Sequence, residues 1–292
     1  MDQAQQLRNV IKLKNQKVQK SARVITITSG KGGVGKSNTA VNLAIQLRKQ
    51  GKKVVIFDAD FGLANVEVMF GTIPKYNLSD LIYGGKTIKE IISKGPMDIG
   101  FVSGGSGIIG LNNLTQEQIA YLVKCIGELN EIADIIIIDT GAGISDQVLK
   151  FVLASPEVLL VSTPDPSSLT DSYSLLKALH KNPDFDSKAT KIHIIANKAS
   201  SREEGKIVYD KLASVVGQFL QGEVNYLGMV PQDPVLERAV RQQKIVSLYD
   251  PKSNAARAYE VLAGNLLKGT HNEAQIKRGI TQMFSNLLKR RN

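Results

Sequence analysis

Short apolar runs alternate with longer amphipathic stretches along most of this chain. Six runs have the length and the β-branched content of buried strands, at residues 23–28, 53–57, 135–138, 158–162, 191–196 and 224–230. Between them the pattern is helical, and residues 36–50 place Ala40, Leu43 and Leu47 on one face. Strands that alternate with helices predict an α/β fold with a doubly wound, mainly parallel sheet. A chain of 292 residues is long enough to bury a full core.

A glycine-rich segment of eight residues, 30–37, lies between the first predicted strand and the first predicted helix. Its spacing is that of a phosphate-binding loop, in which glycine lets backbone N–H groups approach phosphate oxygens. We expect Lys36 to neutralise β- and γ-phosphate charge, Ser37 to hold Mg²⁺, and the helix N-terminus to attract anions. The predicted nucleotide contacts are Gly30, Lys31, Gly32, Gly33, Val34, Gly35, Lys36, Ser37 and Asn38. The alternative is a glycine-rich surface turn.

Carboxylates end two of the other predicted strands. Asp58 and Asp60 follow the run at 53–57, and Asp139 follows the run at 135–138. Ligands bind at the carboxyl edge of parallel sheets, and a strand that is apolar on both faces is buried there. We therefore expect Asp139 to contact Mg²⁺ or its water shell. The alternative for either acid alone is a helix N-cap.

Residues 30–37 carry a lysine, Lys31, directly after the first glycine. With this lysine the segment resembles the deviant Walker A motif of the MinD/ParA class of P-loop ATPases. The resemblance implies slow, regulatory ATP hydrolysis and a homodimer in which Lys31 reaches the nucleotide of the other subunit. It also implies that Asp60 lies in switch I, near the metal, and positions the attacking water. Residues 139–143 resemble the Walker B and switch II region of the class, with Gly141 where many relatives have proline.

The predicted strand at 191–196 ends in a segment that bears on base selectivity. Asn197-Lys198-Ala199-Ser200 lies near the position where GTPases carry N-K-x-D, but Ser200 replaces the aspartate that pairs with guanine. ATP is therefore the expected nucleotide, with Mg²⁺. By resemblance, Asn197 contacts adenine, and the loop that contains Asp233 closes the other side of the base.

The net charge of +10 is concentrated at the two ends of the chain. Residues 1–23 and residues 274–292 each carry a net charge of +5, so the segment between them is formally neutral. We predict a basic tail at 1–23, a P-loop ATPase domain at 24–270 and a C-terminal helix at 271–292. Basic tails suit anionic or acidic partners. No signal peptide or run of ~18 apolar residues is present, which predicts a cytoplasmic protein.

The C-terminal segment has one apolar stripe at helical spacing, flanked by lysine and arginine. Such a helix can lie in an anionic membrane surface, and MinD-class proteins use a comparable helix once ATP has dimerised them. Two helices in one dimer would bind multivalently and reversibly. The predicted membrane-contacting residues are Ile276, Ile280, Met283, Phe284, Leu287 and Leu288. The alternative is a closing helix packed on the core.

The N-terminal residues resemble the D-Q-A-x-x-L-R element of the FlhG family, also called FleN or YlxH. The element here comprises Asp2, Gln3, Ala4, Leu7 and Arg8. The family sets flagellar number and position in bacteria, and its element stimulates the GTPase FlhF. The resemblance also implies contacts with flagellar switch-complex proteins and reversible binding to the inner face of the cell membrane. The alternative is a disordered basic leader.

Two other functions compete with this interpretation. A ParA-type partition ATPase would use the basic tails on DNA, but it leaves the apolar stripe unexplained, so nucleic acid is not the expected partner. A metabolic P-loop enzyme would need an acceptor pocket, for which the sequence indicates no residues. The iron–sulfur carriers of the superfamily need a cysteine pair, whereas Cys125 is the single cysteine of this chain.

Overall fold

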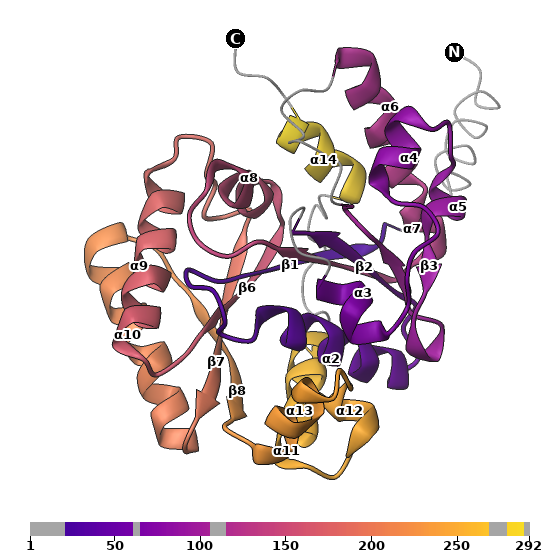
Figure 1. The fold of residues 1–292 in the computed structure, drawn as a ribbon. Coiled ribbons are helices and arrows are strands. Elements are labelled where there is room, and N and C mark those ends of the chain that lie inside the picture. The colour runs from indigo at the N-terminus through magenta and orange to yellow at the C-terminus, as the bar shows by residue number, and fades with distance from the viewer. Residues whose placement is uncertain (1–20, 61–64, 106–114, 269–278, 289–292) are drawn as a thin grey trace, which may run out of the picture.

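The computed structural model describes residues 21–60, 65–105, 115–268 and 279–288 (Figure 1). Within these residues one sheet has the strand order β3-β4-β2-β5-β1-β6-β7-β8, in which only the β3–β4 pair is antiparallel. The strands are β1 (Arg23–Thr28), β2 (Val54–Ala59), β3 (Ser93–Lys94), β4 (Gly100–Val102), β5 (Ile135–Thr140), β6 (Glu157–Ser162), β7 (Lys191–Ala199) and β8 (Asn225–Pro231). The predicted doubly wound sheet is confirmed.

Helices cover both faces of this sheet (Figure 1). The longer helices of the domain are α2 (Lys36–Lys49), α6 (Gln116–Gly127), α8 (Asp146–Ala154), α9 (Pro166–Lys181), α10 (Arg202–Leu220), α11 (Pro234–Arg241), α13 (Asn254–Lys268) and α14 (Ile280–Leu288). The shorter elements are α3 (Asn65–Phe70), α4 (Leu78–Tyr83), α5 (Ile88–Ile91), η1 (Pro96–Asp98), α7 (Leu129–Ile132) and α12 (Val246–Tyr249). No helix of the described segments is long and apolar enough to cross a bilayer.

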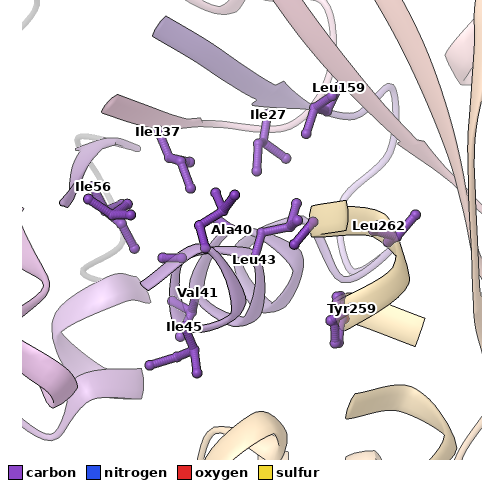
Figure 2. Close-up of a cluster of buried hydrophobic side chains, with 14 of the residues drawn as sticks. Ile27, Ala40, Val41, Leu43, Ile45, Ile56, Ile137, Leu159, Tyr259 and Leu262 are labelled. Carbon is purple, nitrogen blue, oxygen red and sulfur yellow. The ribbon is translucent and has the colours of Figure 1, made fainter. Parts of the chain in front are cut away.

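The central strands are apolar along their length because both of their faces are covered. All six residues of β2 and all six of β5 are buried. On one face, Ile27 and Ile137 pack against Leu43 of α2, with Tyr259 of α13 in the same cluster (Figure 2). This packing fixes the helix that follows the glycine-rich loop.

Buried polar contacts also hold α2 in place. The side-chain oxygen of Asn42 accepts the backbone N–H of Ser247 at 3.0 Å. The amide nitrogen of Gln46 donates to the Ser247 hydroxyl at 3.2 Å and to the Ala256 carbonyl at 3.2 Å. The helix below the phosphate loop is thus tied to α12 and α13 by directional bonds as well as by apolar contacts.

The apolar stripe of the C-terminal helix is buried against the domain. Ile280, Met283 and Phe284 are fully buried in α14, and Leu287 and Leu288 are each only 6% exposed. The helix therefore forms part of the core in this structure, which is the alternative that its sequence left open. Its role at a membrane stays a prediction, and Ile276 lies outside the described residues.

Phe284 anchors α14 between the sheet and α8. Its ring meets the ring of Phe57 edge-on, with 5.3 Å between the centroids, and the ring of Phe151 with 6.0 Å between the centroids. The helix also lies beside α6 (Figure 1). Aromatic edge-to-face pairs of this kind add to the stabilisation that burial provides.

The described segment that begins at Ser21 lies beside the start of α14. The Ala22 N–H donates to the Asn130 side-chain oxygen at 3.0 Å, and Ala22 is buried, so Ala22 packs with the domain. A Cβ atom on Gly279 would lie 2.5 Å from the Ser21 hydroxyl oxygen, so the two segments touch. The predicted partner-binding residues Asp2, Gln3, Ala4, Leu7 and Arg8 lie outside the described residues.

Candidate nucleotide-binding site

The phosphate loop lies at the carboxyl edge of the sheet, after β1 and between the ends of β5 and β6. This is where the strand order reverses, and ligands of doubly wound sheets bind there. A cavity of about 370 Å³ opens beside the loop. Its lining residues come from the loops that follow β1, β6, β7 and β8, from the end of β7 and from the first turn of α10. They are Lys31, Gly32, Gly33, Val34, Thr163, Pro164, Asp165, Lys198, Ser200, Glu204 and Gln232.

Backbone conformation favours glycine at positions 33 and 35 of the loop, and the space beside Gly32 and Gly33 is open. Gly33 has φ 75° and Gly35 has φ 94°, in the left-handed region that side chains disfavour. A Cβ atom on Gly32 or Gly33 would meet no atom within 4 Å. The loop therefore presents an open backbone surface, as a phosphate cradle needs.

The loop is held from behind by α9 and by the end of β7. A Cβ atom on Gly30 would lie 2.2 Å from the backbone carbon of Asp171, so only glycine fits there. The Asn197 amide donates to the Val34 carbonyl at 2.6 Å, and the Lys198 ammonium donates to the Gly33 carbonyl at 2.9 Å. Because each peptide is planar and trans, fixing a carbonyl also fixes the following N–H on the opposite side. Asn197 and Lys198 thus orient the loop's donors.

Lys36 and Asp139 form a buried ion pair at the base of the loop. Their side-chain atoms are 2.9 Å apart, and the side chains are 8% and 0% exposed. Asp139 Oδ2 is buried and has no hydrogen-bond partner among the described residues. A buried carboxylate oxygen needs a partner, and Mg²⁺ or one of its water ligands can supply it. The residues present therefore fit the predicted metal.

Protein side chains alone do not form a closed metal cage here. Within the described ranges no group of three or more His, Cys, Asp and Glu side chains could hold a metal ion. Mg²⁺ usually keeps several waters and takes further ligands from substrate phosphates. Ser37, whose hydroxyl is 3.4 Å from Lys36 Nζ, lies beside the ion pair as the motif predicts.

Asp58 is a site residue that we did not predict. It is aligned with Asp139 across the β2–β5 ladder, and burial, followed by the charge of Asp139, raises its pKa to about 7. Its carboxylate accepts the N–H groups of Asp60 at 3.1 Å and Val66 at 3.3 Å. Asp58 thus fixes the chain on both sides of residues 61–64. A cation nearby would favour its charged form.

The switch residue Asp60 lies near the loop after β5. Its Oδ2 accepts a hydrogen bond from Asn65 at 3.3 Å, and a Cβ atom on Gly141 would lie 3.7 Å from its Oδ1. The predicted switch I and switch II segments are therefore neighbours, because β2 and β5 pair. The role of Asp60 in positioning water stays a prediction.

Lys31 folds back onto its own subunit. Its ammonium lies 3.0 Å from Asp165 Oδ2 and also donates to the Ser167 hydroxyl. Asp165 is the N-cap of α9, and the hydrogen bond from Lys31 lowers the pKa of its carboxyl group. The predicted reach of Lys31 to a second subunit therefore requires that this contact open.

The Asp233 side chain caps helices instead of lining the cavity. Its two oxygens accept the N–H groups of Val235 at 2.8 Å and Ala255 at 2.9 Å, which ties α11 to α13. The preceding residue of this loop, Gln232, does line the cavity. Asp followed by Pro234 is a helix N-terminus signature, so the sequence contained this signal.

Comparisons with known proteins agree with this geometry. A family model described as ParA, NUBPL iron-transfer P-loop NTPase, matches residues 20–267. The antiactivator FleN of Pseudomonas aeruginosa is 39% identical over 82% of this chain and 85% of its own length. The flagellum site-determining protein YlxH of Helicobacter pylori is 36% identical over 99% of this chain and 98% of its own length.

A solved structure gives the same fold. The septum site-determining protein MinD of Pyrococcus horikoshii, complexed with Mg-ADP, superposes with a TM-score of 0.66 at 25% identity, over 87% of this chain and all of that one. The chain is thus similar over most of its length to FleN, to YlxH and to this MinD structure. The chain belongs to the ParA/MinD family of P-loop ATPases, together with FleN and YlxH.

Proposed function

We propose that this ATPase is a nucleotide-switched regulator of flagellar number or placement that binds the membrane reversibly. The names of FleN and YlxH support the flagellar part, and the match to YlxH includes both basic tails. One structural observation carries the switch: the amphipathic α14 has its whole described stripe buried against the domain. The same side chains would be available to a membrane only after the helix leaves.

ATP and Mg²⁺ close the dimer in this proposal. Lys36 and the loop N–H groups bind the phosphates, and Lys31 leaves Asp165 to reach the nucleotide of the second subunit. Ser37, Asp60 and Asp139 would hold Mg²⁺ or its water shell, and the ion supplies neutralisation of phosphate charge. Asp60 orients the attacking water, so hydrolysis ends the dimeric state. Phosphoryl transfer of this kind depends mainly on positioning and charge.

The dimer binds the membrane through its two C-terminal helices. Docking on the core and insertion into lipid compete for one stripe, so a single helix binds membrane weakly. Two helices in a dimer bind multivalently, which makes membrane binding depend on ATP. The protein therefore cycles between the cytoplasm and the inner face of the cell membrane.

The N-terminal element is the contact for an FlhF-type GTPase, and flagellar switch-complex proteins are further partners. We test the first contact by adding the full chain, a chain that begins at Ser21 and an Arg8→Ala variant to purified FlhF. Stimulation of GTP hydrolysis by the full chain alone supports the assignment. Equal stimulation by the shortened chain would contradict this assignment, since that chain lacks all five residues of the element.

The structure offers a direct test of helix release. A Cβ atom on Gly127 would lie 3.8 Å from the Thr281 Cβ, which is the separation that a disulfide needs. The double variant Gly127→Cys/Thr281→Cys, made with Cys125→Ala, should therefore lock α14 to α6 when oxidised. We would sediment it with anionic liposomes in ADP and in ATP, before and after reduction.

The proposal predicts ATP-dependent sedimentation of the reduced protein and none of the oxidised protein. Each single cysteine variant, treated with the same oxidant, should sediment as the parent does. Sedimentation of the locked protein would show that α14 is not the anchor. Salt-sensitive binding to arbitrary duplex DNA in a parallel assay, without liposome binding, would favour the ParA-type partition function instead.

A further inference from the structure

The cavity beside the phosphate loop continues toward the far edge of the sheet. One end is formed by the loop after β1, and the other by Ser200 and Glu204, which follow β7, and by Gln232, which follows β8. Strands β1, β6, β7 and β8 follow one another in the sheet. Three strand spacings of about 4.8 Å separate the two ends, roughly 14 Å in all. This length suits a nucleotide with its phosphates at β1 and its base at β7 and β8.

Glu204 is held firmly at the base end. Its Oε2 accepts hydrogen bonds from both the N–H and the hydroxyl of Ser200, the latter at 2.7 Å. Its own N–H donates to the Ser201 hydroxyl, which caps α10. A Cβ atom on Gly205 would lie 2.8 Å from the Met229 Cβ, so this turn of α10 sits directly on β8. The carboxylate therefore has a fixed position in the cavity wall.

Ser200 lies near the position at which guanine-binding loops place an aspartate, and it holds the carboxylate of Glu204 in the first turn of α10. The bonds from Ser200 lower the pKa of Glu204, so the group is ionised and can only accept hydrogen bonds. In the part of the chain that the structure describes, no hydrogen bond uses its Oε1. Asn197 Oδ1, near the end of β7, is a buried acceptor without a partner among those residues.

Acceptors at this end of the cavity suit a base that donates from its edge. The six-position of adenine carries an amine, whereas the six-position of hypoxanthine or guanine carries a carbonyl oxygen that a carboxylate repels. We infer that Glu204, positioned by Ser200, selects adenine by accepting a hydrogen bond from the exocyclic amine of the base. This inference rests on the nucleotide site proposed above and adds a specificity residue to it.

The test compares nucleotides that differ only at the base. We would measure dissociation constants of Mg-ATP, Mg-ITP and Mg-GTP for the full chain and for Glu204→Gln. The glutamine oxygen can still accept hydrogen bonds from Ser200, so the contact between the two residues is retained. The group that faces the base changes from a carboxylate oxygen that accepts to an amide nitrogen that donates. Glu203→Gln, with the same charge change on the neighbouring exposed residue outside the cavity, is the matched control. Melting temperatures without nucleotide check the fold.

The inference predicts that Glu204→Gln lowers the preference for ATP over ITP about tenfold or more, as loss of a bond to a charged group would. Glu203→Gln should leave the ratio unchanged. Equal weakening of ATP and ITP, or no change, would overturn the inference, and so would weaker GTP binding with ATP binding intact. These ratios are independent of liposome and FlhF binding, so either hypothesis can fail without the other.

Discussion

The Lys31 ammonium lies 3.0 Å from the Asp165 carboxylate, and both belong to the same subunit. The two residues are 134 positions apart, and the loop after β6 brings Asp165 to the phosphate loop. Asp165 also caps α9, so it holds Lys31 from a rigid element. The lysine that is predicted to act between subunits is thus bound within one subunit here.

Replacing Asp165 by Asn should favour the dimer. The side chains are 37% and 52% exposed, and exposed ion pairs contribute little, so we expect ATP-dependent dimerisation to tighten only about two- to fivefold. Sedimentation equilibrium at several protein concentrations measures this, and Lys31→Ala, which should not dimerise, is the control. Weaker dimerisation of Asp165→Asn would instead mean that Asp165 supports Lys31 in the closed state.

Replacing Lys36 by Ala should abolish ATP binding and also destabilise the fold. Removal of one partner leaves Asp139 as an unpaired buried charge, which typically costs about 3 to 5 kcal/mol. Urea denaturation at pH 8 measures this free energy of unfolding. The double variant Lys36→Ala/Asp139→Asn should recover much of the stability but none of the binding. A single variant as stable as the parent would contradict the buried pair.

Replacing Asp60 by Ala should slow hydrolysis and leave the dimer intact. Asp60 is half-buried in the switch I region, whereas Asn197 holds the phosphate loop and Lys36 pairs with Asp139, so we expect nucleotide binding to persist. Phosphate release and size-exclusion chromatography in ATP report the two properties separately. Hydrolysis at the parent rate would remove the proposed role.

The Glu157 carboxylate predicts a dependence of stability on pH. Burial opposes its ionisation, but hydrogen bonds from His193 and Arg23 outweigh this and lower its pKa from 4.5 to about 2. The stabilisation is therefore complete above pH ~4.5 and is lost as pH falls toward 2, on the order of 3 kcal/mol in total. Glu157→Gln should flatten the curve of unfolding free energy against pH between 5 and 2. An unchanged curve would contradict the assignment.

The sheet and the phosphate loop could be predicted because local sequence determines them. The run at 135–138 is apolar on both faces, which is typical of a central strand. Glycine at positions 33 and 35 allows the positive φ angles that the loop adopts. Contacts between distant loops carry no such local signal. Asp165 reaches Lys31, and Glu204 reaches the cavity, only after β6 and β7 have been placed beside β1.

The periodicity of the apolar stripe in the C-terminal helix does not distinguish burial in the core from insertion into a membrane. A protein core and a lipid bilayer select the same apolar side chains, so the spacing of Met283 and Phe284 fits both. Only the rings of Phe57 and Phe151, which surround Phe284, reveal the docked arrangement. Asp233 is the opposite case, since the following proline already indicated a helix cap.

The contact between Ser21 and Gly279 gives the two ends of the chain a common pivot. If this contact persists when α14 binds a surface, Ser21 is held near that surface as well. A partner captured by the N-terminal residues would then search in two dimensions rather than three. Anchoring and recruitment would be one event in space, although they belong to opposite ends of the sequence.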